Sequence, residues 1–504
     1  MKLLAFFLIV STRADIPCLQ STTASGPYCV CNATHCDSVP PLLNLTYSEY
    51  QLYSSSKENL GFQSTQGKFS NVTLANEVLV SLKTHYQKIL GFGGAFTDST
   101  GINIDSLSNK CQSLLLESYF GSTGIGYSVG RVPIGGTDFS LKGYSYCDKQ
   151  DDSLDSFALQ EEDFKYKVPL IQRALELRGG GNLKLFASAW SAPVWMKNTD
   201  KYNGFGKVVP KYYQLWAKYY LKFFEEYEKQ GVAFWGVTSQ NEPIDGLIGT
   251  TVPNNGFDSE EMKNWIKEAL GPAIRNSTFK NLKIILHDDQ RLLLPLLKTL
   301  VLTDEEVVKY ADGVGVHFYT DFFVPGSFLD LVEVEGKSLF RLATEGCAGS
   351  AHIFGLTEAV DLGSWSRAET YLSSIFTDLK HDVIGWVDWN MALNRSGGPN
   401  WIRNEVDSPI IVDSEKDEFY KQPMFYALGH FSKFVVPGSV RIGSESVLSD
   451  LEVLSFLRPD GKIVVVLWNK SNEAKSVNLA VDNLAGNLNL PAKSINTLLL
   501  SLYK

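Results

Sequence analysis

Eight short apolar runs, separated by longer amphipathic segments, follow one another between about residues 87 and 393 of this 504-residue chain. The runs have the length of buried strands, and the segments between them place apolar side chains at i, i+3 and i+4 with charges opposite. Regular alternation of strand and helix predicts an α/β chain whose parallel sheet closes into a (β/α)₈ TIM barrel. A doubly wound open sheet is the alternative, but the first run lacks the Gly-x-Gly-x-x-Gly turn typical of that fold.

The predicted elements can be given by residue number. The strand candidates are Ile89–Phe96, Gly126–Ile134, Leu183–Ala189, Phe234–Ser239, Lys283–His287, Gly313–Tyr319, Leu339–Thr344 and Ile384–Trp389. The long helix candidates are Ser106–Phe120, Glu162–Arg178, Lys211–Lys229, Glu260–Arg275 and Trp365–Lys380, and shorter ones cover Asp304–Tyr310 and Phe328–Val334.

The C-terminal tail has a different pattern. From residue 436 onward, runs such as Leu451–Phe456, Ile463–Trp468 and Ser476–Val481 alternate apolar and polar residues between turn sequences. This period of two predicts an antiparallel β module. Similar runs within Leu42–Lys83, before the barrel, are expected to join it.

The N-terminus predicts export. Lys2 is followed by the apolar run Leu3–Val10, so we expect residues 1–14 to be a signal peptide, which is too short to span a bilayer. No later stretch reaches 18 uncharged apolar residues, so the mature chain is expected to be soluble. The candidate N-glycosylation sites are Asn32, Asn44, Asn71, Asn276, Asn394 and Asn469.

Four of the seven cysteines, Cys18, Cys29, Cys31 and Cys36, cluster near the N-terminus. In an exported chain this spacing favours disulfides over a zinc site, and four cysteines allow three pairings. A net charge of −10 argues against a nucleic-acid partner. The seven histidines show no metal-binding spacing and no phosphate-binding loop is present, so neither a metal nor another cofactor is expected.

Two of the predicted strands end on a glutamate. Glu242, in Asn-Glu-Pro, follows the fourth strand, and Glu345 follows the seventh. Catalytic residues of barrels lie at these carboxyl ends, and strands four and seven face each other across the mouth. Two acids across a cleft suffice for glycoside hydrolysis, because one protonates the leaving oxygen while the other attacks or activates water. Either glutamate alone could simply cap the following helix.

Sugar-binding side chains are expected at the same strand ends. The amide of Asn241 adjoins one acid and can bond a sugar hydroxyl, and Asp138 with Phe139 follows the second strand. Aromatic rings that could stack on a sugar face stand at Trp190, Tyr319 and Trp389.

Longer stretches carry a resemblance to a known family. They are "GFGGAFTDST", "ASAWSAPVWMK", "NEP", "HDDQRLLLP", "GWVDWN", "GGPNWIRNEVDSPIIVD" and "FYKQPMFYALGHFSKF". Together they resemble family 30 of the glycoside hydrolases, the family that contains the glucosylceramidases, over essentially the whole mature chain.

The resemblance implies roles that the pattern alone does not give. Glu242 matches the acid/base and Glu345 the nucleophile of a retaining enzyme. The residues that match the glucose pocket are Asp138, Trp190, Asn241, Trp389 and Asn404, and those that match the shell around the acids are Arg131, His317, Tyr319 and Cys347. The implied bridges are Cys18–Cys29 and Cys31–Cys36, which leaves Cys111 and Cys147 without an assigned pairing.

The resemblance also implies three structural parts. They are a small disulfide-bridged antiparallel sheet (15–39 plus about 391–420), an immunoglobulin-like β module (40–86 plus 436–504) and the barrel (87–390 plus 421–435). The implied substrate is glucosylceramide, met at an anionic lipid membrane surface with a saposin-type activator, in the lysosome or after secretion.

Other β-glycosides (xyloside, galactoside or steryl glucoside) are alternative substrates, and a non-catalytic sugar- or lipid-binding homologue is a further alternative. The loops Lys201–Pro210 and Ile244–Thr251 depart from the pattern of the mammalian relatives, so the implied glucose pocket is better supported than the implied ceramide site.

Overall fold

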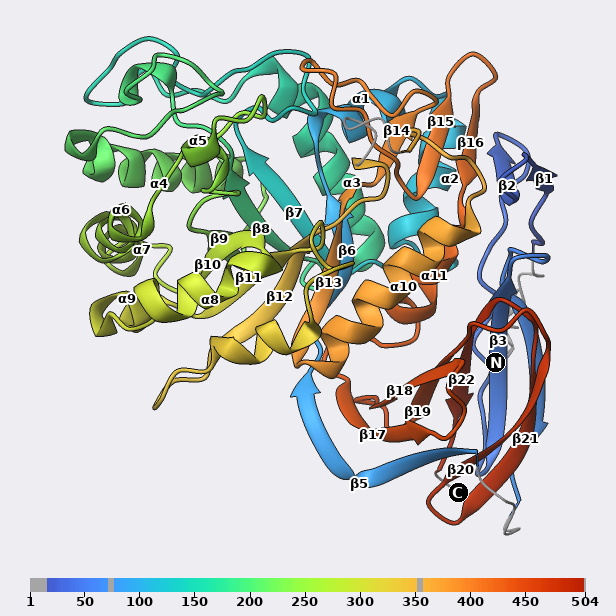
Figure 1. The fold of residues 1–504 in the computed structure, drawn as a ribbon. Coiled ribbons are helices and arrows are strands. Elements are labelled where there is room, and N and C mark those ends of the chain that lie inside the picture. The colour runs from blue at the N-terminus through green and yellow to red at the C-terminus, as the bar shows by residue number, and fades with distance from the viewer. Residues whose placement is uncertain (1–15, 71–76, 351–356, 503–504) are drawn as a thin grey trace, which may run out of the picture.

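The computed structural model describes residues 16–70, 77–350 and 357–502, so the expected signal peptide and Asn71 lie outside the described residues. Eight parallel strands form a closed barrel (Figure 1). They are β6 (Gly91–Ala95), β7 (Val129–Ile134), β8 (Lys184–Ala189), β9 (Gly236–Thr238), β10 (Lys283–Gln290), β11 (Gly313–His317), β12 (Phe340–Glu345) and β13 (Val383–Asn390). The predicted barrel and its eight strands are confirmed.

Close packing between β6 and β7 depends on glycine. A Cβ atom at Gly93 would lie 1.7 Å from the carbonyl oxygen of Val129, which no side chain could accommodate. The amino-terminal half of the barrel interior is filled by Leu90, Val129, Phe186, Ile285, Leu342 and Val387. We call these side chains the apolar floor. They close the barrel at the amino-terminal ends of its strands, and the carboxyl ends remain available for the site.

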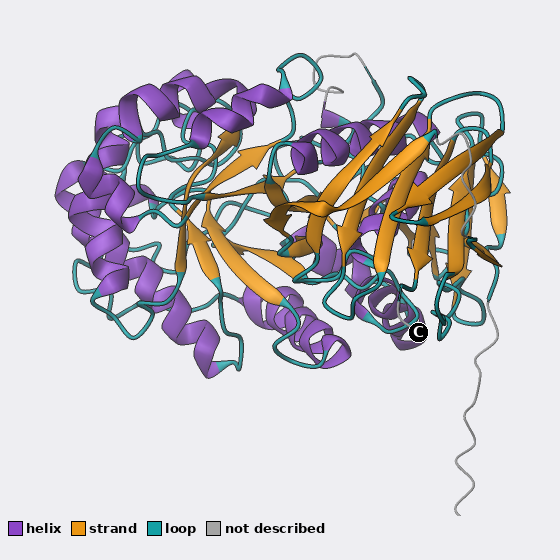
Figure 2. Cartoon of the chain, turned by 90° about the horizontal axis from the view of Figure 1, so that it is seen from below, coloured by secondary structure: helices purple, strands orange, loops and turns teal. Residues whose placement is uncertain are grey.

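Helices surround the barrel strands (Figures 1 and 2). In chain order they are α1 (Asp98–Asp105), α2 (Asn109–Phe120), α3 (Val168–Arg178), α4 (Tyr213–Lys229), α5 (Asp245–Ile248), α6 (Ser259–Asn264), α7 (Gly271–Arg275), α8 (Leu294–Leu296), α9 (Glu305–Tyr310) and α10 (Trp365–Lys380). The predicted helix 260–275 is interrupted by a π-helical stretch, Trp265–Leu270. The expected helix Phe328–Val334 is instead a 3₁₀ segment, Gly326–Val332.

Strands from both flanks of the barrel share a nine-stranded sheet. Its order is β21 (Leu484–Leu490), β20 (Lys475–Val481), β5 (Val78–Lys88), β17 (Val440–Ser446), β18 (Leu451–Leu457), β19 (Ile463–Asn469), β22 (Ser494–Leu500), β3 (Glu49–Ser56) and β4 (Gln63–Lys68). Along β19, Ile463, Val465 and Leu467 enter the core of this module, while the alternate residues join the core shared with the barrel. Successive residues of β19 therefore point to two faces of the sheet, and both faces are buried.

One buried helix, α11 (Pro423–Ser432), joins the barrel to this sheet. Both ring nitrogens of His430 are hydrogen-bonded to module hydroxyls, to Thr497 Oγ1 at 2.9 Å and to Ser55 Oγ at 3.0 Å. Burial lowers the pKa of His430 to about 3, so the ring is neutral, with one nitrogen donating and the other accepting.

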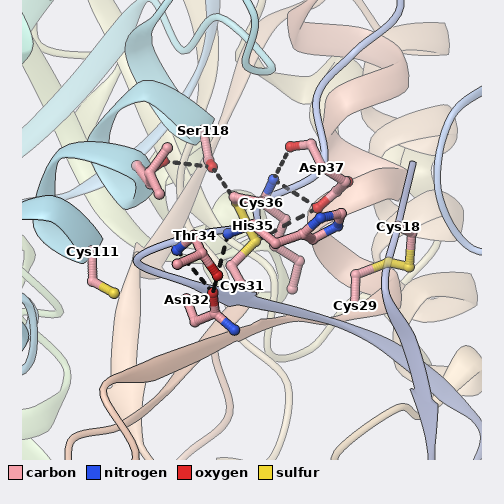
Figure 3. The surroundings of a disulfide bond; sticks show 12 residues. Cys18, Cys29, Cys31, Asn32, Thr34, His35, Cys36, Asp37, Cys111 and Ser118 are labelled. Atoms are coloured by element: carbon pink, nitrogen blue, oxygen red, sulfur yellow. Dashed lines mark hydrogen bonds and ion pairs between the residues drawn. A yellow bond between two sulfur atoms is a disulfide. The ribbon is translucent and has the colours of Figure 1, made fainter. Parts of the chain in front are cut away.

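A small sheet carries the disulfides. Its order is β1 (Gln20–Thr22), β2 (Pro27–Asn32), β16 (Glu418–Lys421), β15 (Ile410–Asp413) and β14 (Ala392–Asn394), and every pairing is antiparallel except β14 with β15. Cys18 is bonded to Cys29 and Cys31 to Cys36, the pairing that the resemblance implies (Figure 3). The other cysteines, Cys111, Cys147 and Cys347, are buried free thiols.

The predicted glycosylation sites differ in accessibility. Asn44 and Asn276 are exposed, and Asn32 and Asn394 are partly buried. Asn469 is fully buried, and its amide donates to the backbone oxygens of Glu473 and Pro491. A glycan there would break these bonds, so we withdraw Asn469 from the candidates. Among the described residues, no helix combines the length and apolarity that a bilayer crossing requires.

Candidate active site

Arg131, on β7, organises the mouth of the barrel. Its side chain is fully buried and donates to Asn241 Oδ1 at 2.7 Å, to Asp288 Oδ2 at 2.8 Å and to Glu345 Oε2. A guanidinium presents its donors in a rigid plane, so one side chain fixes groups from three other strands or strand ends. Two of these partners, Asn241 and Glu345, are predicted site residues that the structure brings together.

Glu345 is the last residue of β12 and is 5% exposed. Its Oε1 accepts a hydrogen bond of 2.7 Å from the Tyr319 hydroxyl. Burial raises the pKa of Glu345, whereas the positive charges of His317 and Arg131 act in the opposite direction. The carboxyl group is thus held by a hydrogen bond on each oxygen.

Glu242 follows β9 in a left-handed backbone conformation, with φ of 37°. Its amide N–H donates to the carbonyl oxygen of Asp288 at 3.0 Å. A non-glycine residue in this region is uncommon. The side chain points into the mouth, where Oε1 accepts from Gln290 Nε2 at 2.7 Å and from His317 Nδ1 at 2.8 Å.

His317, the last residue of β11, bridges two carboxylates. Its Nδ1 faces Glu242, and its Nε2 lies 3.1 Å from Asp288 Oδ1. Burial lowers the pKa of His317, but the neighbouring carboxylates outweigh this effect and raise the pKa well above its usual range. The ring is therefore a buried imidazolium that donates from both nitrogens.

The two glutamates lie close together at the mouth of the barrel. One carboxylate oxygen of Glu242, one of Glu345 and a ring nitrogen of His317 lie within 4.8 Å of one another. A separation of roughly 5 Å between carboxyl groups is typical of retaining glycosidases, while inverting enzymes leave about 6.5–9.5 Å for a water molecule. This geometry can hold one sugar ring between an attacking and a protonating group.

Two further carboxyl groups lie close to Glu242. Burial, together with the charges of Glu242 and Asp289, raises the pKa of Asp245 to about 9. Burial and the charge of Glu242 raise the pKa of Asp289 to about 7, and its Oδ2 accepts from the backbone N–H of Ile244 at 3.2 Å. Asp245 and Asp289 therefore hold their protons at acidic pH, so these two additional carboxyl groups add no negative charge to the site.

Asp138 stands in the loop after β7, where it meets residues from the loop after β14. Its Oδ2 accepts from the amides of Asn400 and Asn404, both at 3.0 Å. Burial raises the pKa of Asp138 to about 7, although both amides lower it. Asp138 and Asn404 are two of the residues that the resemblance places in the glucose pocket, and Asn400 is an additional partner of Asp138.

The aromatic side chains at the mouth of the barrel differ in their packing. Trp190 and Trp389 stack on each other at 4.8 Å, and the Arg131 guanidinium lies 4.7 Å from the Trp190 ring centroid. Phe139 was expected to offer a face to sugar. Instead it is fully buried and packs edge-on behind Trp389 at 6.0 Å, so it supports the tryptophan.

Cys347 is buried, and its thiol lies 3.5 Å from the Tyr319 hydroxyl. Burial raises the pKa of Cys347 well above its usual range, so the group is a neutral thiol. It therefore packs beside the nucleophile candidate without the thiolate that a cysteine nucleophile needs.

The described residues contain two groups of three possible metal ligands. In the first, Cys31 and Cys36 are bonded to each other. In the second, formed by Glu242, His317 and Glu345, both ring nitrogens of His317 already face carboxylates and Arg131 lies against Glu345. Neither set fits a metal ion.

Sequence reasoning assigned no role to Asp288, Gln290, Asp289 or Asp245. Asp288 is fully buried between Arg131 and His317; burial raises its pKa, but these two cations outweigh burial and lower it. For Asp288, Asp289 and Gln290 the signal was the stretch "HDDQ" within the quoted "HDDQRLLLP", which carries four polar residues into the end of a buried strand.

A closed barrel with two neighbouring carboxyl groups at its mouth can carry out glycoside hydrolysis. Comparison with protein families gives the class of the chain as a glycosidase. A model described as the glycosyl hydrolase family 30 TIM-barrel domain matches residues 89–435. A second, described as the glycosyl hydrolase family 30 beta sandwich domain, matches residues 438–498. The chain belongs to glycoside hydrolase family 30.

Several individual proteins are similar to this chain over most of its length. Lysosomal acid glucosylceramidase of Mus musculus is 43% identical over 94% of this chain and 93% of its own length. Putative glucosylceramidase 4 of Caenorhabditis elegans is 41% identical over 96% and 94%. Among solved structures, SrfJ from Salmonella typhimurium is 29% identical with a TM-score of 0.83, covering 90% of this chain and 99% of SrfJ.

Proposed function

We propose that this chain is a retaining β-glucosidase that hydrolyses glucosylceramide to glucose and ceramide. The observation that supports this proposal most directly is that a carboxylate oxygen of Glu242 and one of Glu345 lie within 4.8 Å of each other. The names of the mouse and nematode relatives support the choice of substrate.

In the first step the Glu345 carboxylate attacks the anomeric carbon, and the bond to the ceramide oxygen breaks. Glu242 donates its proton to that oxygen, so ceramide leaves as an alcohol. Arg131 and Tyr319 hold the attacking carboxyl group in place before the sugar arrives. The product of this step is a glucosyl ester of Glu345.

In the second step Glu242, now ionised, removes a proton from water while the water oxygen attacks the same carbon. The ester bond to Glu345 breaks and glucose leaves with its original configuration. The imidazolium of His317 stabilises Glu242 in this ionised state, because it donates to Oε1.

The proposal extends to place and partners. We infer that the chain acts in the lysosomal lumen, after export and glycosylation, on substrate presented by an anionic lipid surface with help from a saposin-type activator. The printed name of the mouse relative supports the location. The raised pKa values of Asp138 and Asp289, both about 7, suit a site that works in acid.

The test compares glucosylceramide with galactosylceramide, each with and without anionic lipid and activator, and includes a panel of fluorogenic glycosides. We expect glucose release from glucosylceramide, stimulated by anionic lipid. Preference for a xyloside, galactoside or steryl glucoside would contradict the substrate assignment. Glu242→Ala should lose activity most on substrates with poor leaving groups, and with azide it should form the β-glucosyl azide from an activated substrate. Glu345→Ala with azide should instead form the α-glucosyl azide, because azide then takes the place of the nucleophile.

A further inference from the structure

The loop that carries Asp138 is only weakly fixed by the strand before it. Gly135 and Gly136 lie between the end of β7 and Asp138, and Gly135 has a φ of 83°. Glycine has wide backbone freedom, so the strand alone does not determine where Asp138 points. The position of its carboxyl group must be set by contacts between the loop and other elements.

One such contact comes from Asp98, the first residue of α1. Its Oδ2 accepts a hydrogen bond of 2.6 Å from Ser140 Oγ. The same hydroxyl accepts from the backbone N–H of Thr137 at 3.0 Å. Asp98 therefore reaches the backbone directly before Asp138 through a single hydroxyl group.

The same turn of α1 holds the other side of Asp138. Ser99, next to Asp98, donates to the carbonyl oxygen of Phe139 from its backbone N–H at 3.0 Å and from its hydroxyl at 2.8 Å. The start of α1 thus fixes the backbone on both sides of the residue expected to bind sugar.

Asp98 is itself held by buried polar groups. It is 2% exposed, and its Oδ2 also accepts from the Tyr144 hydroxyl at 3.0 Å. The fully buried Lys167 places its Nζ 3.7 Å from Asp98 Oδ1 and 2.8 Å from Asp163 Oδ1. One buried cation is therefore shared by two carboxyl groups, and one of these contacts the loop.

Net stability is a poor explanation for this arrangement. Desolvation offsets the attraction within a buried ion pair, and apolar side chains of similar volume often serve as well. Apolar side chains in place of Asp98 and Lys167 could not, however, accept the hydrogen bond from Ser140. The effect that only the polar group can have is the one on the loop.

We propose that Asp98, acting through Ser140, is a positioning residue that holds Asp138 where its carboxyl group binds a hydroxyl of the sugar ring. This rests on the proposed function, in which Asp138 lines the glucose pocket. The amides of Asn400 and Asn404 orient the side chain of Asp138. Asp98 fixes the backbone from which that side chain extends. A purely structural role for Asp98 is the alternative.

The test is a double-mutant cycle on the full chain, with Ser140→Ala and Asp138→Ala, assayed on a soluble fluorogenic β-glucoside. Ser140→Ala leaves Asp98 and Lys167 in place. We expect it to lower kcat/KM about fivefold or more, through KM and with kcat changed less than about twofold, because it loosens a group that binds the sugar. In the Asp138→Ala background the same change should lower kcat/KM less than about twofold, because the side chain that it positions is gone.

Variants of Asp98 and a control complete the design. Asp98→Ala should lower kcat/KM at least as much as Ser140→Ala, and Asp98→Asn, which keeps an oxygen that can accept from Ser140, should restore part of it. Asp98→Ala should fold, because Lys167 keeps Asp163 as its partner. The control is Tyr227→Phe, which removes a hydroxyl that donates to Asp163 at 2.7 Å. It should lower stability in urea and leave KM unchanged.

The outcomes separate this inference from the proposed function. An unchanged KM in Ser140→Ala, or an equal loss in both backgrounds, overturns the positioning role and leaves Asp98 a structural one. A rise in KM in Tyr227→Phe as large as that in Ser140→Ala does the same. A wild-type chain that cleaves a galactoside or a xyloside in place of β-glucosides overturns the proposed substrate instead, and the cycle on that glycoside then decides the role of Asp98.

Discussion

The lower and upper halves of the barrel interior are built from the same strands and have opposite chemistry. The floor holds aliphatic and aromatic side chains, among them Val129, Phe186 and Ile285. A few residues further along the same strands, the mouth holds Arg131 and Asp288, which are fully buried charges. The floor is stabilised by packing alone, whereas the mouth is stable only because each charge has an opposite partner.

The side chains of the two halves are also positioned by different features of the strands. On β7 and β8, simple alternation leads from Val129 to Arg131 and from Phe186 to Ser188. On β10 and β12 the register shifts, so that His317 pairs with Glu345. Such irregularities re-aim side chains next to active sites. The floor follows the period of the strand, and the carboxylates proposed as catalytic depend on departures from it.

The first prediction removes the proposed nucleophile, Glu345, from the mouth. Glu345→Gln should lower kcat on a soluble β-glucoside by about 10⁴-fold or more, because the amide cannot form the glucosyl ester. Folding should survive, because Arg131 keeps Asp288 as an ion-pair partner. Rates and urea unfolding measure the two effects. Near-normal turnover would remove Glu345 from its role.

The second prediction breaks the charge pairing. Arg131→Met keeps an unbranched side chain but takes the guanidinium away from Asp288 and Glu345, with His317 as their remaining cation. We expect a loss of about 3–5 kcal/mol in the free energy of unfolding, measured in urea at neutral pH. The loss should shrink at acidic pH, where carboxyl groups can take up protons. A stability equal to that of the wild type would show that the pairing contributes nothing.

The third prediction tests the floor. Leu342→Ala should cost about 2–4 kcal/mol of unfolding free energy through the cavity it leaves. Because the floor carries no catalytic group, kcat should change less than about threefold. A large fall in kcat with little loss of stability would mean that the two halves are not separable.

The sequence predicts the regular strands of the barrel, but it does not predict the contacts at the mouth that depend on irregular backbone. Strand periodicity locates all eight barrel strands, and their ends locate Glu242 and Glu345. The contacts of Asp288 and Gln290 need left-handed backbone at His287 and Asp288 and a register shift in β10, which no periodic pattern encodes. Phe139 is buried behind Trp389, which lies 250 residues further along the chain. The sequence pattern could not predict this contact either.

The smallest expected effect concerns Asp245. Its pKa in the folded chain, about 9, lies above its ordinary value of 3.8. Stability from the protonated group is complete below that ordinary value and is lost as the pH rises toward the folded value. Asp245→Asn should therefore flatten the fall of Tm between acidic and alkaline pH by a few degrees. Asp155→Asn, at an exposed position, is the control and should leave the profile unchanged.

The configuration of the first sugar released tests the central claim most directly. If the two glutamates act across a separation of 4.8 Å or less, hydrolysis of a β-glucoside proceeds through the Glu345 ester and retains configuration. Proton NMR during the first minutes of turnover should then show β-glucose, with α-glucose appearing later by mutarotation. Initial release of α-glucose would contradict this account, because it would require water, and not Glu345, to attack the sugar.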